Sequence, residues 1–337
     1  MATPSYDPTR YTKTTCKTTP ALHMNNLSAG SGQLSYTHGQ QVILLSQDAV
    51  LAGSDAAPKQ CGVKDSVDIL ESKFVVIDGN TYLVLATAVG VQFWDAAGNN
   101  IVFNYQFGDD NQVDNKVRTS FAKGITSVIA ADDTELICVG SSSGNIFVFE
   151  GSAFKFKCVH IIKGEHKEPI SALASEYGDM MSSGQTQQRH LISADDAGQV
   201  VVWSALSSTT FTKTNTIARA GFPCCGVKVR GDRLIVAYTD GLLAFYNLDT
   251  CTKWMELTAH SRFLSAIAIH PSKDIFATVA EDSTLNVWTL PDCGNKLEVL
   301  MSVSWTDSML CGVTFCGPDN NAVAACAFDT EEIRIWQ

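Results

Sequence analysis

The sequence LTAHSRFLSAIAIHPSKDIFATVAEDSTLNVWTL, residues 257–290, contains three short apolar segments with polar turns between them. We expect strands at residues 264–270, 275–280 and 285–288, because β-branched and aromatic residues alternate or run together there and no helical spacing continues through them. His260 precedes Trp288 by 28 positions, and Asp282 lies in a tight turn six positions before Trp288. This segment therefore predicts one unit of antiparallel strands.

The same unit recurs along the chain. Each copy has a polar turn and then an alternating strand that ends in a large side chain, at Trp94, Phe149, Trp203, Tyr246, Trp288 and Trp336, with a weaker copy that ends at Leu45. The ends, from Leu45 onward, are 49, 55, 54, 43, 42 and 48 residues apart. A period of this length, with four strands per unit, is typical of a β-propeller rather than of a sandwich or barrel. Seven copies predict an all-β fold, a single seven-bladed β-propeller.

The unit at residues 257–290 resembles a WD repeat, the propeller unit named for its Trp-Asp dipeptide. In that family a His, a Ser or Thr, an Asp and the Trp form a hydrogen-bonded chain that ties the turn to the strands. The resemblance implies two such sets in this sequence: His260, Thr278, Asp282 and Trp288, and His166, Ser193, Asp196 and Trp203. Other units lack the His, so we expect those blades to depend more on packing.

The chain also resembles one particular member of the WD-repeat family over most of its length. The similar segments are NNLS at residues 25–28, SADDAGQVVVW at 193–203 and MLCGVTFCGPDNNAVAACAFDTEEIRIW at 309–336. This resemblance implies a propeller scaffold in the cytoplasm with no established catalytic activity. It implies no particular binding residues.

The last unit predicts how the ring closes. We expect its strands at residues 310–315, 322–328 and 332–336, after which the sequence stops at Gln337 and leaves no residues for an outer strand. An unpaired strand edge invites pairing with another chain. Residues 11–18, YTKTTCKT, are rich in Thr and Tyr and are predicted to form the missing outer strand. We therefore expect a flexible segment at residues 1–10 and one propeller over residues 11–337.

Composition narrows the classes of partner and compartment. The 337 residues are 45% hydrophobic and 18% charged, and 24 Lys and Arg against 35 Asp and Glu give a net charge of −11. Such a balance argues against nucleic acid or an anionic membrane as the main partner, because both are bound by clustered Lys and Arg. Eleven Cys without a CxxC pair, no secretory signal and no spanning segment predict a reduced, cytoplasmic protein without membrane insertion.

No motif predicts a catalytic, metal or cofactor site. A GxSxG sequence at residues 140–144 could place Ser142 as a hydrolase nucleophile, but an expected strand follows it where a nucleophile elbow needs a helix. The seven His do not have zinc-ligand spacing, and the acidic run Asp109, Asp110 and Asp114 lacks the EF-hand pattern. Nucleotide-binding glycine motifs are missing as well. We therefore predict that the protein is not an enzyme and has no cofactor, with a serine hydrolase as a remote alternative.

The leading functional prediction is a scaffold that binds other proteins through its loops. The loops that precede the innermost strands should share one face of the ring near its axis. The candidate partner-binding residues there are Lys167, Glu168, Phe222, Arg262 and Phe263. Exposed aromatic and Arg side chains dominate the binding energy of many interfaces, although Phe222 and Phe263 could instead pack under their own loops. The alternative is a subunit of a cytoskeletal or ciliary assembly.

Overall fold

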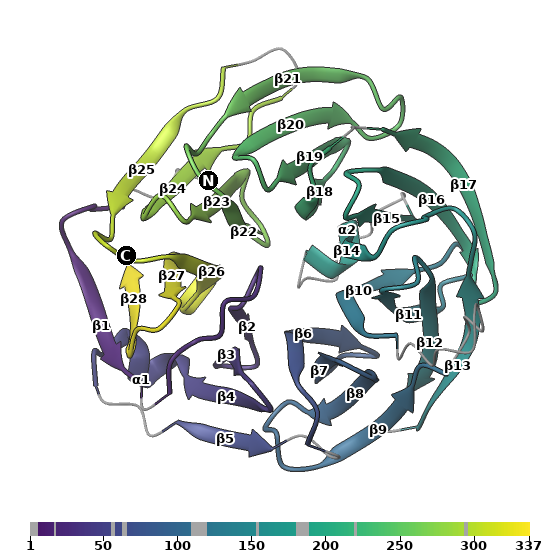
Figure 1. Cartoon of the computed structure of the whole chain (residues 1–337), viewed down its shortest axis with the longest axis horizontal. Coiled ribbons are helices and arrows are strands. Elements are labelled where there is room, and N and C mark those ends of the chain that lie inside the picture. The colour runs from purple at the N-terminus through teal and green to yellow at the C-terminus, as the bar shows by residue number, and fades with distance from the viewer. Residues whose placement is uncertain are drawn as a thin grey trace.

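The computed structural model describes residues 6–16, 18–54, 58–62, 66–108, 120–152, 155–179, 189–218, 221–292 and 296–337. These residues form seven four-stranded antiparallel sheets arranged as a ring around a central axis (Figure 1). The predicted all-β fold and the predicted number of blades are both confirmed. The innermost strands of the blades surround the channel along the axis, and the N-terminal segment supplies the outermost strand of the last blade.

The blades follow one another along the chain, and each is described from its innermost strand outward. Blade 1 is β2 (Ser28–Gly30), β3 (Gln33–His38), β4 (Gln41–Ser46) and β5 (Lys59–Gly62). Blade 2 is β6 (Ile69–Ile77), β7 (Asn80–Thr87), β8 (Gly90–Asp95) and β9 (Ile101–Gln106). Blade 3 is β10 (Ala122–Ile129), β11 (Glu135–Ser141), β12 (Ile146–Ser152) and β13 (Lys155–Ile162).

The remaining blades have the same order. Blade 4 is β14 (Ile170–Ser175), β15 (His190–Asp195), β16 (Val200–Ser207) and β17 (Thr210–Ile217). Blade 5 is β18 (Cys224–Arg230), β19 (Arg233–Tyr238), β20 (Leu242–Asn247) and β21 (Lys253–Thr258). Blade 6 is β22 (Leu264–Ile269), β23 (Ile275–Ala280), β24 (Thr284–Thr289) and β25 (Val299–Ser304). Blade 7 is β26 (Leu310–Cys316), β27 (Ala322–Ala327), β28 (Glu332–Trp336) and β1 (Tyr11–Thr15). Short helices are α1 (Gln47–Leu51), α2 (Glu176–Asp179) and the 3₁₀ turn η2 (Pro318–Asn320).

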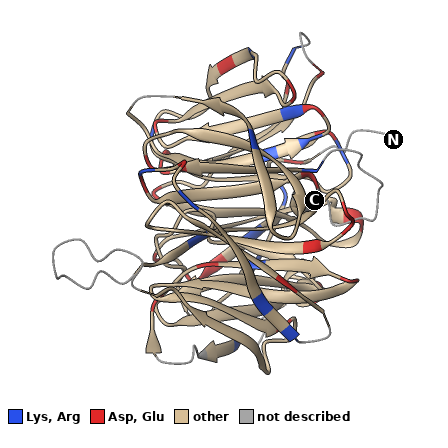
Figure 2. Cartoon of the chain, turned by 90° about the vertical axis from the view of Figure 1, so that its right-hand side faces the viewer, with Lys and Arg blue, Asp and Glu red and all other residues tan. Residues whose placement is uncertain are grey.

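The core lies between the faces of neighbouring blades. Every residue of β23 and of β27 is buried, because the second strand of a blade is covered on both faces by adjacent sheets. The outer strand β21 contains only exposed and half-buried residues. A strand that is covered on both faces needs apolar residues at successive positions, which explains the short apolar segments in the sequence. Figure 2 shows charges of both signs scattered over the ring, with long stretches of strand between them that carry none.

The ring is closed by the N-terminal strand, as predicted. Strand β1 pairs antiparallel with β28, and Tyr11 lies opposite Trp336 while Thr14 lies opposite Ile333. The described strand ends at Thr15, and Lys17 lies outside the described residues. Of the predicted flexible segment at residues 1–10, residues 1–5 lie outside the described residues, and Tyr6 is buried in the core between blades 6 and 7.

Two kinds of connection share one face of the propeller, which we term the entry face. They are the loops that precede the innermost strands and the turns that join the second strand of a blade to the third. Backbone hydrogen bonds link them within a blade: Asp196 N donates to Pro169 O, Glu281 N to Phe263 O and Phe328 N to Met309 O. The entry face therefore combines residues from two separate parts of each repeat.

Candidate interaction face

The sixth blade contains a buried chain of four polar side chains behind the entry face. His260 Nε2 lies 2.8 Å from Thr278 Oγ1, and Trp288 Nε1 donates to the same oxygen at 2.9 Å. His260 Nδ1 lies 3.2 Å from both carboxylate oxygens of Asp282. These contacts join the loop before β22, the strands β23 and β24, and the turn between them.

Ionisation in this set follows from burial and hydrogen bonding. Burial lowers the pKa of His260, and the carboxylate of Asp282 opposes that shift only in part. Burial by itself raises the pKa of Asp282, but hydrogen bonds from Ser261 N, His260 and Thr284 outweigh it and hold that pKa below its usual value. The set is therefore a neutral imidazole beside a carboxylate, which suits a structural role.

The fourth blade has a similar set, but its carboxylate is not the predicted one. His166 Nε2 lies 2.7 Å from Ser193 Oγ, which also accepts a hydrogen bond of 2.8 Å from Trp203 Nε1. His166 Nδ1 lies 2.7 Å from Asp195 Oδ2, so the prediction of Asp196 was wrong. Asp195 is the last residue of β15, whereas Asp196 lies in the turn, where its side chain faces Lys123 and Glu168. The carboxylate of the fourth blade thus comes from the end of the second strand, and that of the sixth blade from the turn after it.

A cavity of about 660 Å³ opens on the entry face at the axis, and we term it the mouth cavity. Its apolar wall includes Leu22, Met24, Leu70, Phe121 and Phe263, and its ionisable side chains are His23, Asp68, Lys123 and Glu281. This volume is within the range of roughly 300–1,000 Å³ that is typical of ligand sites.

Burial lowers the pKa of two ionisable groups in the mouth cavity, His23 and Lys123. It lowers the pKa of His23, and the nearby Lys123 lowers it further while Asp68 opposes the shift. Burial also lowers the pKa of Lys123, against the attraction of Asp196 and Glu71. The mouth cavity therefore combines a mainly apolar wall with a few partly compensated charges.

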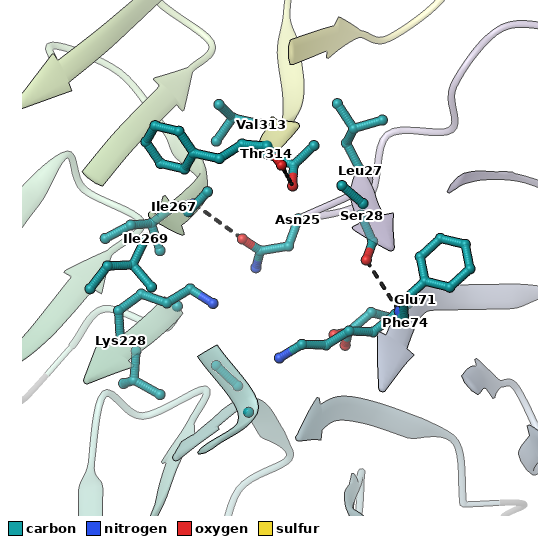
Figure 3. A pocket seen from close by; sticks show the side chains of 18 of the residues that line it. Asn25, Leu27, Ser28, Glu71, Phe74, Lys228, Ile267, Ile269, Val313 and Thr314 are labelled. Atoms are coloured by element: carbon teal, nitrogen blue, oxygen red, sulfur yellow. Dashed lines mark hydrogen bonds between the residues drawn. The ribbon is translucent and has the colours of Figure 1, made fainter. Parts of the chain in front are cut away.

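The central channel continues inward from the mouth cavity. Neighbouring residues of the inner strands line the two cavities in turn. Leu70 and Lys123 line the mouth cavity, and the residues that follow them, Glu71 and Gly124, line the channel. Figure 3 shows Asn25 in this channel with Lys228 and Glu71 around it. The channel cavity has a volume of about 130 Å³, much smaller than that of the mouth.

A segment of the N-terminal region crosses the channel at its mouth. Asn25 precedes blade 1, yet its side chain donates to Cys225 O of blade 5 at 2.7 Å and accepts from Ile267 N of blade 6 at 3.2 Å. Asn25 has φ 57°, a left-handed conformation that Asn tolerates better than most residues. These contacts hold Leu22 and Met24 at the mouth.

Exposed apolar side chains gather on the entry face. Among the described residues nine large hydrophobic side chains are exposed. Five of them are in entry-face loops or turns: Leu22, Phe222, Phe263, Met309 and Phe328. Binding surfaces are enriched in such anchors, whereas single exposed hydrophobics scattered over a surface need no explanation.

The predicted partner-binding residues lie on this face. Lys167 and Glu168 are exposed in the loop before β14, and Arg262 and Phe263 are exposed in the loop before β22. Phe222 is 45% exposed, and of the predicted residues only Phe263 lines the mouth cavity. Five further side chains at the mouth cavity or exposed on the entry face were not predicted: Leu22, Met24, Lys123, Met309 and Phe328. The repeat could have indicated Met309 and Phe328, because they lie at or beside the ends of predicted strands of the last unit.

The serine of the GxSxG sequence lies in a turn between strands. Ser142 Oγ is 3.1 Å from Ser120 Oγ and accepts a hydrogen bond of 3.1 Å from Phe121 N. Strand β12 follows it. The described part of the chain holds no group of three or more His, Cys, Asp or Glu arranged to bind a metal ion. The acidic run Asp109, Asp110 and Asp114 lies outside the described residues.

No helix within the described ranges has the length and apolar character needed to cross a membrane.

Comparisons with known proteins agree with the repeat and the fold. The family model described as WDR54 matches residues 20–337. WD repeat domain 54 of Rattus norvegicus is 29% identical over 309 residues, which cover 88% of this chain and 87% of that protein. WD repeat-containing protein 54 of Homo sapiens is 28% identical over 329 residues, covering 92% of this chain and 93% of that protein. The predicted resemblance to a WD-repeat protein is confirmed.

Two further matches are more distant. Target of rapamycin complex subunit wat1 of Schizosaccharomyces pombe is 23% identical over 221 residues, which cover 61% of this chain and 64% of that protein. A chain in the crystal structure of the Mitotic Checkpoint Complex superposes with a TM-score of 0.73 at 14% identity, covering all of this chain and 93% of that one. The structural match supports the propeller fold.

Proposed function

The chain belongs to the WDR54 family, and from this membership we propose that it is a non-catalytic platform that binds other proteins on the entry face of its propeller. The observation that carries the proposal is the gathering of five exposed apolar side chains on that face. Apolar and aromatic anchors at the centre of a patch contribute most of the binding energy in interfaces. The two His-centred sets lie directly behind the entry-face loops and hold those loops in place.

The composition supports a cytoplasmic location. Ten cysteines are free in the described part of the chain, and eight of them are buried. Buried free thiols persist most readily in a reducing compartment.

A non-catalytic role is supported by the surroundings of Ser142. Its hydroxyl contacts Ser120 and a backbone amide rather than an imidazole. Incubation of the purified protein with a fluorophosphonate probe tests this point: we expect no covalent adduct, and labelling that Ser142→Ala abolishes would establish a hydrolase instead.

A narrower proposal is that the protein is a subunit of a larger assembly, with a cytoskeletal or ciliary one as our prediction. The similarity to wat1, which is described as a subunit of a complex, supports the general form of this proposal. Sedimentation of a native cell extract through a density gradient tests it. A subunit of an assembly should sediment as a particle much larger than the single chain of 36.4 kDa.

Affinity purification with quantitative mass spectrometry tests the entry-face proposal. The tagged full chain is compared with Phe263→Ser/Phe328→Ser on the entry face and with Leu206→Ser/Ile101→Ser, which removes exposed apolar side chains elsewhere. We expect the co-purifying proteins to be depleted by the first pair of substitutions and retained by the second. Retention by both variants, or loss with the second variant alone, would contradict binding on the entry face.

A further inference from the structure

A second cavity of the entry face lies between blades 6 and 7, and we term it the blade 6–7 groove. Its volume is about 410 Å³. Its walls come from the loop before β22, the turn between β23 and β24, and the loop before β26. Ser283 Oγ donates to Ser308 O at 2.8 Å, which joins the two blades at this groove.

Carboxylates dominate the charge of the blade 6–7 groove. Glu281, Asp282 and Asp307 line it, and Arg262 is the one basic residue that does so among the described residues. Asp282 already accepts hydrogen bonds from His260 and Ser261 N. Glu281 and Asp307 have no side-chain hydrogen bond or ion pair within the described part of the chain. Two carboxylates are therefore available at the groove to a cationic ligand.

One exposed apolar side chain lines the groove, and two more belong to residues whose backbones bond to lining residues. Phe263 is 39% exposed beside Glu281, whose N–H donates to the Phe263 carbonyl. Met309 lines the groove and is 36% exposed, and its carbonyl accepts from the N–H of Phe328, which is 37% exposed. The surface therefore combines exposed apolar side chains with the carboxylates of the groove.

We propose that the blade 6–7 groove binds an extended basic segment of a partner protein, with Arg or Lys side chains facing Glu281 and Asp307 and apolar side chains on Phe263, Met309 and Phe328. The inference rests on the proposed platform function and specifies the chemistry of the partner. Complementary charge steers association and fixes register, while apolar anchors supply affinity. The net charge of −11 strengthens the attraction of a cationic segment.

The same charges disfavour other occupants. A nucleic acid or an acidic peptide would place its anions against three carboxylates. A second copy of this chain would bring another charge of −11 to the surface. A basic protein segment is the occupant that the groove complements.

Fluorescence anisotropy with the full chain tests the proposal. The probe is a short fluorescein-labelled peptide that alternates arginine and leucine, and the comparison peptides replace either every arginine by glutamate or every leucine by serine. Glu281→Gln/Asp307→Asn should weaken binding of the arginine–leucine peptide about tenfold, since each exposed ion pair contributes modestly. Added salt should reduce the affinity of the wild type more than that of this variant.

The matched control is Glu298→Gln/Asp48→Asn, which removes the same two charges from exposed positions far from the groove. We expect less than a twofold change in Kd for this control. Equal weakening by both variants, or equal binding of the glutamate peptide, would overturn the groove proposal. Depletion of co-purifying proteins by Phe263→Ser/Phe328→Ser without any peptide preference would refute the basic segment while leaving the platform function intact.

Discussion

The imidazole Nδ1 of His166 lies 2.7 Å from a carboxylate oxygen of Asp195, both side chains being almost completely buried. Asp195 Oδ1 also accepts hydrogen bonds from the N–H groups of Ala197 and Gln199. One carboxylate therefore fixes both the turn after β15 and the loop that carries His166. Its neighbour Asp196 makes none of these contacts.

Substitution of the two aspartates should separate their roles. Asp195→Ala should lower the free energy of unfolding by about 1–3 kcal/mol, because it leaves buried donors unsatisfied. Asp196→Ala, the adjacent comparison, should cost less, about 0.5–1 kcal/mol, because its half-buried carboxylate loses only its attraction to Lys123. Urea denaturation followed by tryptophan fluorescence measures both. Equal losses in the two variants would argue against the assignment of Asp195.

A glycine in the fifth blade should be intolerant of a side chain. Gly241 has φ 91°, and a Cβ at this position would lie 2.2 Å from the carbonyl oxygen of His260. Gly241→Ala should cost roughly 2–4 kcal/mol from backbone strain and steric overlap together. Gly231 is the control, since it has φ 59° with no atom near its would-be Cβ, and Gly231→Ala should cost about 1 kcal/mol. Thermal unfolding of the two variants should preserve this order; the reverse order would refute the contact.

Acid should destabilise the protein through His270. Its Nδ1 accepts hydrogen bonds from Ser272 N and Lys273 N, and burial, with Lys273 and Arg230, lowers its pKa to about 4. The unfolded chain, with a His pKa of about 6.5, binds more protons between these values, so stability is lost as pH falls from about 6.5 to 4. In His270→Asn the amide oxygen can accept the same two bonds without titrating. Urea unfolding across this range should therefore show a shallower loss in the variant, and parallel pH profiles would contradict the assignment.

Removal of the N-terminal strand should open the ring. Deletion of residues 1–16 takes away β1 and exposes the edge of β28, so we expect aggregation and a large fall in melting temperature. The ion pair of Lys13 with Glu332, at 3.1 Å, lies on the surface and should contribute no more than about 1 kcal/mol. Lys13→Ala is therefore the control and should melt close to the wild type. A monomeric deletion variant with unchanged melting would show that β1 is dispensable.

The propeller was predictable because Trp203, Trp288 and Trp336 each end a copy of one repeated unit. Each blade buries its two faces against the neighbouring blades, so the unit has to recur around the ring. The closing strand was predictable for the same reason, since a missing strand leaves an edge. The Asp195 contact was not, because blades 4 and 6 take the carboxylate from different positions of the repeat and the contact depends on local geometry. The exposure of Phe263 likewise depends on loop packing, which has no period.

Phe263 should be dispensable for folding and important for binding. Its ring is 39% exposed at the mouth cavity, so Phe263→Ala should change the free energy of unfolding by less than about 1 kcal/mol. Phe276, in the same blade, is fully buried and stacks on Trp288, so Phe276→Ala should cost about 3–5 kcal/mol. Chemical denaturation provides the stability of both variants, and anisotropy with the arginine–leucine peptide provides the affinity of Phe263→Ala. A stability loss at Phe263 comparable with that at Phe276 would show that its ring belongs to the core, and an unchanged affinity would remove it from the binding surface.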